Sequence, residues 1–438
     1  LAAALSGLVP AIAAQRVAPA SALRAARTLG LGRFAGPSSA LLIAQVAVSL
    51  MLLIGAGLFI RSLHNLRTQD LGLARDNQLL AWIVPGQTGR QDDAMVDLWH
   101  TMLERLSTIP GVAAVGASNQ AVLNGGLVGM GVPSVAIIIP GQPTALTPKI
   151  SGRSFVTPGF FAAAGIRVVA GREFTERDAG ETSHVVMMNA TMARFYFGSE
   201  AAAVGRVVRF PGPSKQPHQI VGVINDFVRT TPRHTLDYFS TFYPYRHADA
   251  INRGQQSRLR VMLVAIKTTV PPLTIADDVR KEIRAIDPLL PVLRINTPDD
   301  QLEGLLAQDR IVASLSTALG ATAMVLASLG LFGLLSYRVA RRTNEIGVRL
   351  AFGATRGAVI ALVLRESGRL IAVGLVVGVA AAVMLARFVS ARLFGVSATD
   401  PWTIAGAMLL LAIVACIAAL IPARQAATVD PSVALRCD

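Results

Sequence analysis

The sequence predicts an α-helical membrane protein that carries a large mixed α/β domain outside the bilayer, and three observations support this fold class. The chain of 438 residues is 52% hydrophobic, and its mean hydropathy is +0.51. Crossing about 30 Å of hydrocarbon takes roughly 20 apolar residues, and four stretches qualify: 38–60, 313–337, 370–389 and 402–421. One long polar segment, 61–312, separates the first span from the other three and gives a 1+3 layout of four transmembrane helices.

The charge is distributed as in a membrane protein. Of the formal net charge of +14, residues 61–312 contribute little, with 26 basic and 22 acidic residues. The other 186 residues carry 15 basic and 5 acidic ones, grouped beside the spans. Basic residues beside spans mark the cytoplasmic side, whereas a nucleic-acid-binding domain would carry a basic stripe. We therefore expect contact with membrane lipid and no nucleic-acid partner.

The same rule orients the spans. Segment 15–37 holds Arg16, Arg24, Arg27 and Arg33 without an acid, which predicts a cytoplasmic linker. The first span then leads out, and the second returns to a basic connector at 338–369. The third span leads out again, and the fourth returns to a cytoplasmic tail at 422–438. Residues 61–312 are thus expected outside the cytoplasm of a multi-pass membrane protein.

The outer segment has the pattern of a mixed α/β domain, long enough for two small lobes. Short β-branched runs predict strands, and amphipathic runs predict helices. The predicted strands are 79–84, 112–117, 185–188, 219–224 and 259–267, and the predicted helices are 92–106 and 274–286. Segment 122–148 is rich in Gly and Pro and is expected to be a loop. The aromatic run Tyr238–Tyr245 predicts a core strand, with a substrate- or partner-facing surface as the alternative.

The head of the chain repeats its tail. Residues 8–11, Val17, Pro19 and 22–24 align without gaps to residues 420–423, Val429, Pro431 and 434–436. A tandem duplication of a four-span unit explains this register. We expect residues 1–14 to be the end of a transmembrane helix of a preceding repeat unit, so that the chain would be a fragment.

No motif for catalysis or cofactor binding is recognisable, which predicts that the chain is not an enzyme. The sequence contains no Gly-Lys dipeptide of a phosphate-binding loop, no Gly-x-Ser-x-Gly elbow and no histidine pair at metal spacing. The carboxylate pairs 92–93, 277–278 and 299–300 are expected at helix starts. Any ATP would have to be bound by a partner.

Two glycines in the third span predict a close helix contact. Gly374 and Gly378 have the spacing that lets helix backbones approach each other in a membrane. Packing inside the bundle and a specific dimer interface are both compatible with this motif.

The connector has a pattern unlike the rest of the chain. As a helix it would place Arg342, Glu345 and Arg349 on one face, beside an apolar ridge of Ile346 and Leu350. Gly347 and Gly353 disfavour a helix and indicate close approach by another backbone or a turn. The residues alone leave open whether this segment is an interfacial anchor or a surface that receives a signal.

Residues 345–354, Glu-Ile-Gly-Val-Arg-Leu-Ala-Phe-Gly-Ala, resemble the signature of MacB/FtsX-like ABC transporter permeases, with Asn344 where arginine is usual. The outer segment is similar to the MacB-type periplasmic core domain in residues 156–161, 171–174, 186–190 and 221–223. Residues 393–401, 422–424, 430–431 and 434–436 are similar to the second half of duplicated orphan permeases of acidobacteria.

The resemblance implies a bacterial inner-membrane permease with a MacB-like periplasmic core domain at 61–312 and an FtsX-like permease domain at 313–421. An ABC-type ATPase would dock on the connector, through Arg341, Arg342, Glu345, Gly347, Arg349 and Gly353, and drive efflux by moving the outer domain. Further partners would be a membrane-fusion protein, an outer-membrane channel, and a first repeat unit or second copy. The alternative is a non-transporting FtsX-like scaffold that regulates a cell-envelope enzyme.

Overall fold

The computed structural model describes residues 37–90, 92–120, 122–123, 134–135, 138, 151–180, 183–209, 216–229, 233, 239–246, 259–341, 346, 352 and 355–427. The expected preceding helix at 1–14, most of the loop expected at 122–148 and the last residues of the tail lie outside this part. The chain divides into two compact units, residues 63–310 and the remainder, which are described separately below.

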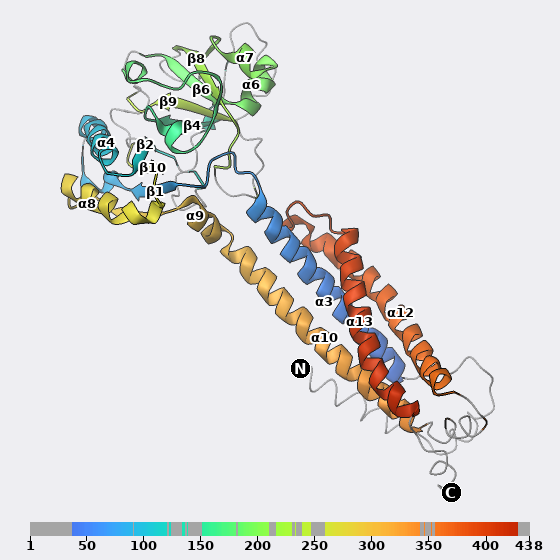
Figure 1. Cartoon of the computed structure of the whole chain (residues 1–438). Coiled ribbons are helices and arrows are strands. Elements are labelled where there is room, and N and C mark those ends of the chain that lie inside the picture. The colour runs from blue at the N-terminus through green and yellow to red at the C-terminus, as the bar shows by residue number, and fades with distance from the viewer. Residues whose placement is uncertain are drawn as a thin grey trace. The chain divides into compact units, whose positions relative to one another are not determined.

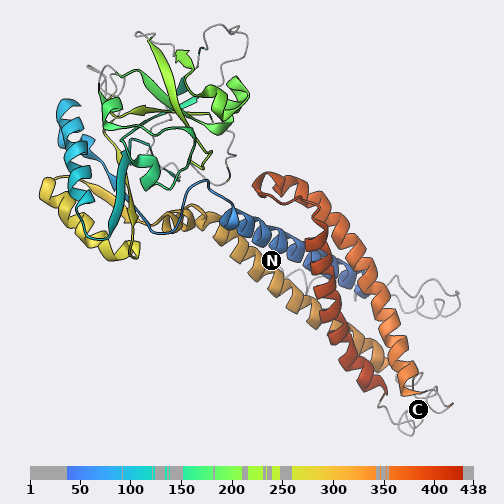
Figure 2. The ribbon, with the colours of Figure 1, turned by 45° about the horizontal axis from the view of Figure 1, so that its top comes forward.

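Within the described residues, the membrane unit consists of four long helices (Figures 1 and 2). They are α3 (Pro37–Thr68), α10 (Ala307–Arg341), α12 (Arg356–Val389) and α13 (Pro401–Ala427). Each of the four is long and apolar enough to cross a membrane. Their buried residues, among them Leu50, Leu331, Leu370 and Leu411, form one apolar cluster between the helices, while large apolar residues such as Leu329 and Val376 remain exposed, as lipid contact requires.

All four of these helices are longer than the hydrocarbon core of a bilayer is thick. At 1.5 Å per residue, the 35 residues of α10 extend about 52 Å and the 34 residues of α12 about 51 Å, against about 30 Å of hydrocarbon. The third span predicted at 370–389 is therefore only the later part of α12. The residues before it, including Arg365, Glu366 and Arg369, continue the same helix instead of forming an irregular connector.

In the outer unit, the strands within the described residues form one mixed sheet in the order β11-β1-β10-β2-β4-β9-β6-β8-β5, with β3 beside β4 and β7 beside β8. The strands are β1 (Gln78–Ile83), β2 (Val112–Ser118), β3 (Ser134–Val135), β4 (Ser151–Val156), β5 (Val168–Gly171), β6 (Val185–Asn189), β7 (Val207–Arg209), β8 (Pro217–Ile224), β9 (Ser240–Pro244), β10 (Met262–Thr268) and β11 (Val292–Asn296). The two halves of the sheet join through a single residue pair, Ser118 with Val156. This arrangement gives two lobes on one sheet.

Helices cover the two halves of the sheet separately (Figure 1). α4 (Asp92–Ser107) and α8 (Ala276–Ile286) lie side by side on the half formed by β1, β2 and β10. α6 (Ala190–Phe197) and α7 (Glu200–Ala203) pack on the half that contains β6 and β8. The short helix α5 (Phe160–Ala163) packs on β2, and α9 (Pro298–Leu305) precedes α10.

The helix α4 shows why these residues form the core. Met95, Leu98, Trp99, Met102 and Leu106 recur at helical spacing and are all buried. The indole Nε1 of Trp99 donates a hydrogen bond to the carbonyl oxygen of Leu259 at 3.3 Å, which satisfies the one polar atom that this side chain brings into the core.

The described part of the aromatic run, 239–245, contains the core strand β9, whereas Tyr238 lies outside the described residues. Phe242, Tyr243 and Tyr245 are 2%, 0% and 1% exposed, so the partner-facing alternative for these three residues is wrong. The carboxylate pairs lie where the sequence predicts them. Asp277 and Asp278 occupy the first turn of α8, Asp299 and Asp300 the first turn of α9, and α4 begins at Asp92.

Candidate functional site

The connector between α10 and α12 is short. α10 ends at Arg341 and α12 begins at Arg356, where Thr355 caps the new helix by accepting a hydrogen bond from the amide of Ala358 at 3.3 Å. Of the connector residues expected to contact an ATPase, the structure describes Arg341, which is exposed at the end of α10. Arg342, Glu345, Gly347, Arg349 and Gly353 lie outside the described residues.

Two apolar residues of the connector have opposite environments. Ile346 is 6% exposed and packs with Val359 of α12 and Val339 of α10. Phe352 is 88% exposed. Ile346 thus contacts the ends of both helices, whereas the side chain of Phe352 faces its surroundings. Ile346 was recognisable in the sequence as part of an apolar ridge, whereas Phe352 was not selected there, since exposure of one aromatic residue has no sequence pattern.

The glycine pair of α12 lies directly against α3. A Cβ atom on Gly374 would come within 2.7 Å of Cγ1 of Val46, and one on Gly378 within 3.0 Å of both Cα and the carbonyl oxygen of Ala47. Real Cβ atoms are almost never found that close to other atoms. The two glycines therefore allow the α3 and α12 backbones to touch inside the membrane, and in this structure the motif serves packing within one chain.

Polar side chains join α3 to α10 at three levels. Near the cytoplasmic end, Arg338 donates to the hydroxyl of Ser39 at 2.5 Å. Further along, the Nε2 of Gln45 donates to the carbonyl oxygen of Leu326 at 2.6 Å, and the hydroxyl of Ser49 donates to the carbonyl oxygen of Ala323 at 3.0 Å. Such bonds between membrane helices contribute roughly 0.6 kcal/mol each. They make α3 and α10 one pair.

At the outer end of the bundle, the loop between α12 and α13 is fastened to α3. The amide of Phe394 donates to the hydroxyl of Ser62 at 2.9 Å, and Arg61 pairs with Asp400 at 2.5 Å. Asp400 also accepts hydrogen bonds from the hydroxyl and the amide of Thr403 and so caps α13. The Thr403 hydroxyl is the main cause that lowers the pKa of Asp400.

Within the outer unit, the last turn of α3 and the first turn of α10 are held together by ion pairs. Glu303 of α9 contacts Arg67 of α3 at 2.9 Å and Arg310 of α10 at 3.6 Å. Arg75, which follows α3, pairs with Asp299 of α9 at 2.5 Å, and Asp309 of α10 pairs with Arg233. All of these ion pairs lie within residues 63–310 and form one charged cluster around α9.

Among the described residues, no group of three or more His, Cys, Asp or Glu side chains is placed to hold a metal ion. The contacts that the structure describes near the candidate site are the packing of Ile346, the hydrogen bonds between α3 and α10, and the ion pairs around Glu303.

This arrangement defines a class: a multi-pass inner-membrane protein of 1+3 helices that carries a large mixed α/β extracytoplasmic domain. Comparison with protein families identifies the family within this class. Residues 39–286 match the MacB-like periplasmic core domain, and residues 317–431 match the FtsX-like permease C-terminal domain. The chain belongs to the MacB/FtsX-like family of ABC transporter permeases.

Individual relatives agree with this assignment. The chain is 26% identical to the macrolide export ATP-binding/permease protein MacB of Campylobacter jejuni over 63% of this chain and 42% of MacB. It is 25% identical to the ABC transporter permease YknZ of Bacillus subtilis over 64% of this chain and 68% of YknZ. It is 28% identical to the pyoverdine export ATP-binding/permease protein PvdT of Pseudomonas aeruginosa over 61% of this chain and 39% of PvdT. The chain thus spans less than half of the length of MacB and PvdT.

Two solved structures are similar to the outer part of the chain. The periplasmic region of MacB from Actinobacillus actinomycetemcomitans matches with a TM-score of 0.36 and 15% identity, covering 55% of this chain and 97% of that region. The extracellular domain of YknZ from Gram-positive bacteria matches with a TM-score of 0.32 and 17% identity, covering 50% of this chain and 100% of that domain.

Proposed function

We propose that this chain is the permease part of an ABC-type exporter and converts ATP hydrolysis by a partner into movement of its outer domain. The observation that carries the proposal is the connector, in which Ile346 is fixed between α10 and α12 while Phe352 is exposed. A partner that binds Phe352 and the neighbouring arginines would act on the ends of two membrane helices at once.

The route onward from the connector follows the helices. Hydrogen bonds from Gln45 and Ser49 join α10 to α3, and the pair enters the outer unit at the cluster around Glu303. The glycine contact transmits a displacement of α12 to α3, because touching backbones resist compression more than flexible side chains do. The buried polar contacts found here join helices to each other, so in this proposal the exported substance does not pass through the bundle.

The names of the relatives support the exporter class. MacB and PvdT are named as ATP-binding/permease proteins for macrolides and pyoverdine. From this we infer an ABC-type ATPase as partner of the present chain. A membrane-fusion protein, an outer-membrane channel, and a second copy or preceding repeat unit complete the proposed assembly. The relatives give no support to the alternative of a signalling scaffold.

The proposal predicts that ATPase binding depends on Phe352. We expect Phe352→Ala to lower the amount of ATPase that co-purifies with the solubilised chain by at least fivefold, because exposed aromatic residues at interfaces contribute about 2 kcal/mol or more. Charge reversal at Glu345→Arg or Arg349→Glu should have the same effect. The measurement is quantitative mass spectrometry of proteins recovered with the tagged chain from native membranes.

The matched control is Phe388→Ala. Phe388 is 83% exposed and lies at the opposite end of α12, so its removal tests for a general effect of losing an exposed aromatic residue. Undiminished ATPase recovery with all three connector variants would overturn the proposed docking site.

A further inference from the structure

Two exposed aromatic side chains lie at the outer end of the membrane unit and are not used by the proposed coupling. Phe388, the second-last residue of α12, is 83% exposed, and Trp402, the second residue of α13, is 78% exposed. Tryptophan is enriched at membrane–water interfaces, because its large ring is apolar while its N–H can remain hydrated. The contacts of neighbouring residues place both rings along α3, and from there relative to the bilayer.

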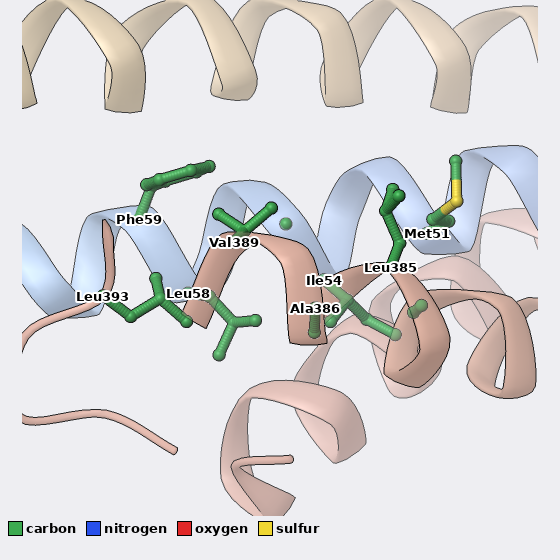
Figure 3. Close-up of a pocket in the computed structure, with 10 residues that line it drawn as sticks. Met51, Ile54, Leu58, Phe59, Leu385, Ala386, Val389 and Leu393 are labelled. Atoms are coloured by element: carbon green, nitrogen blue, oxygen red, sulfur yellow. The ribbon is translucent and has the colours of Figure 1, made fainter. Parts of the chain in front are cut away.

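Phe388 lies at the level of Leu58 of α3. Ala386 and Val389, on either side of Phe388 in the sequence, line one narrow groove together with Leu58, and Figure 3 shows the three side chains around the same space. The outer end of α12 is therefore level with the part of α3 around residue 58.

Trp402 lies at the same level, although it belongs to the next helix. A Cβ atom on Gly57 of α3 would come within 2.6 Å of Cγ2 of Thr403, the residue after Trp402. The exposed rings of α12 and α13 are thus both level with residues 57–58 of α3 and form one aromatic border at the outer end of the bundle.

Arginines mark a second level near the cytoplasmic end of α3. The guanidinium of Arg338 donates to the hydroxyl of Ser39 at 2.5 Å. Gly374 of α12 lies against Val46 of α3, and Arg369 precedes Gly374 by five residues. Because α3 and α12 run in the same direction, Arg369 is level with residue 41 of α3, close to Ser39.

The two levels are one hydrocarbon thickness apart. From residue 39 to residue 58, α3 rises about 28 Å, and the same rise separates Arg369 from Phe388 on α12. The hydrocarbon core of a bilayer is about 30 Å thick. Between these levels α3 and α12 carry no charge apart from Arg387, which lies beside Phe388 and can extend its guanidinium into the headgroups. The two levels therefore fit the inner and outer limits of the hydrocarbon.

α12 continues well past the inner limit. It begins at Arg356, 13 residues before Arg369, which corresponds to about 20 Å of helix. A tilt of about 20°, the average for membrane helices, shortens this projection only to about 18 Å. The headgroup layer on one side is about 5–7 Å thick. The first two turns of α12, including Val359 against which Ile346 packs, therefore extend beyond the headgroups.

We propose that Trp402 and Phe388 bind the carbonyl region of the outer leaflet and that, with the bundle at this depth, residues 356–362 of α12 stand in the cytoplasm clear of the headgroups. The partner of the aromatic border is the lipid–water interface. The connector residue Ile346 is held outside the bilayer, which argues against the interfacial anchor that the sequence left open. This inference does not depend on the proposed ATPase, because it rests on contacts and helix lengths within the membrane unit.

The fluorescence of Trp402 measures its depth directly. The chain has three tryptophans, and Trp82 and Trp99 are 6% and 0% exposed within the outer unit, so bromine atoms on lipid chains reach Trp402 alone. The full chain is reconstituted into phosphatidylcholine brominated either near the ester group or near the methyl end of the acyl chain. We expect at least twofold stronger quenching by the first lipid. Trp402→Phe is the control and should abolish quenching by both.

Two results would overturn the proposed depth. Stronger quenching by bromine near the methyl end would place Trp402 deep in the hydrocarbon. Absence of quenching by both lipids in the unchanged chain would mean that protein, and not lipid, covers Trp402.

Cysteine reactivity tests the cytoplasmic end of α12 independently. Ala361 and Ala380 are both exposed on α12, but Ala361 lies eight residues before Arg369 and Ala380 eleven residues after it. With Cys416 and Cys437 replaced by alanine, proteoliposomes of the purified chain are exposed to a charged maleimide on both sides. Ala361→Cys should react at least tenfold faster than Ala380→Cys, because a thiolate forms poorly in hydrocarbon. Equal rates, or protection of Ala361→Cys until detergent is added, would contradict the proposed emergence of α12.

Discussion

Two side-chain contacts in the outer domain show the structural role of the residues that resemble the MacB-like core. Phe161 and Glu173 are 12 positions apart in the sequence, and the carboxylate of Glu173 accepts a hydrogen bond from the amide of Phe161 at 3.1 Å. Burial raises the pKa of this carboxyl group. The neighbouring Arg172 forms two hydrogen bonds to Asp178, at 2.6 and 3.0 Å. The residues that carried the resemblance at 156–161 and 171–174 thus include both sides of one structural contact, which explains these two segments without a ligand.

This joint predicts a pH-dependent contribution to stability. Hydrogen bonding from Arg172 lowers the pKa of Asp178 from 3.8 to about 2. A carboxyl group whose pKa is lowered by folding contributes its full stabilisation at pH values above its pKa in the unfolded chain. This contribution is lost as the pH falls through the folded-state pKa of about 2. We expect Asp178→Asn to cost about 1 kcal/mol at pH 6, since Arg172 is half exposed and the pair is partly screened by solvent. The cost should be well below that value at pH 2, where the Asp178 carboxyl group is about half protonated in the folded state.

The free energy of unfolding of the solubilised full chain, measured by denaturant titration at pH 6 and pH 2, checks this expectation. Asp76→Asn serves as control, because Asp76 is exposed in a turn and its replacement should change little at either pH. A cost of Asp178→Asn that is the same at both pH values would contradict the role assigned to the Arg172–Asp178 pair.

At the scale of elements, the contact between α3 and α12 is the most constrained packing in the membrane unit. A larger residue at Gly378 would press on the backbone of Ala47, and one at Gly374 on the side chain of Val46. We expect Gly378→Leu to destabilise the bundle by about 1–3 kcal/mol, which is typical of overpacking, and to lower the thermal unfolding midpoint by several degrees. Gly368→Leu in the same helix should leave the midpoint nearly unchanged, because a Cβ there meets no atom within 4 Å.

Fluorescence-detected thermal unfolding of the solubilised variants measures this difference. Similar midpoints for Gly378→Leu and Gly368→Leu would mean that α3 and α12 do not touch in the folded protein. A change of oligomeric state specific to Gly378→Leu would instead revive the dimer interface that the sequence left open.

The sequence predicted those elements whose own residues form a recognisable pattern. Runs of β-branched residues predicted β1, β2, β6, β8 and β10, and apolar length predicted the four spans. Strand β4 was missed because Ser151–Val156 contains Gly, Ser and Arg, and its place in the sheet comes from pairing with β9. The start of α12 was missed because a hydropathy window registers only the part of a helix that lies in lipid, whereas the helix continues through Arg365 and Arg369.

The residues of the candidate site were likewise predictable from the sequence only where they form a local motif. The arginines of the connector and the glycine pair were recognisable as motifs. The partners of these residues were not, because Val46, Ala47 and Val359 are ordinary apolar residues that become specific only through tertiary contact. The charged cluster around Glu303 joins residues more than 200 positions apart in the chain, and its members show no pattern of their own.

At the scale of the whole molecule, the proposed function requires a path from the connector to the outer domain. Ile346 packs against α10 and α12, hydrogen bonds join α3 to α10 inside the membrane, and both helices take part in the charged cluster at Glu303. Each of these junctions is made by side chains and not by the backbone hydrogen bonds of the helices. In the proposed mechanism we therefore expect transmission to be separable from folding.

This separability predicts a variant that binds its partner but does not transmit. We expect Glu303→Gln, which weakens the pairs with Arg67 and Arg310, to leave ATPase recovery unchanged and to lower nucleotide-dependent changes in the outer domain. Hydrogen exchange of residues 63–310, compared with and without ATP in membranes that contain the partner, measures the second effect. Loss of ATPase recovery in this variant would contradict the division between docking and transmission.

The central claim is that a partner ATPase docks on the connector, and photocrosslinking in native membranes tests it most directly. A photoreactive phenylalanine analogue at position 352 should crosslink to an ATPase subunit, and the same analogue at the equally exposed position 388 should not. Crosslinks from position 352 that contain only lipid or an envelope enzyme, with no ATPase, would contradict the account.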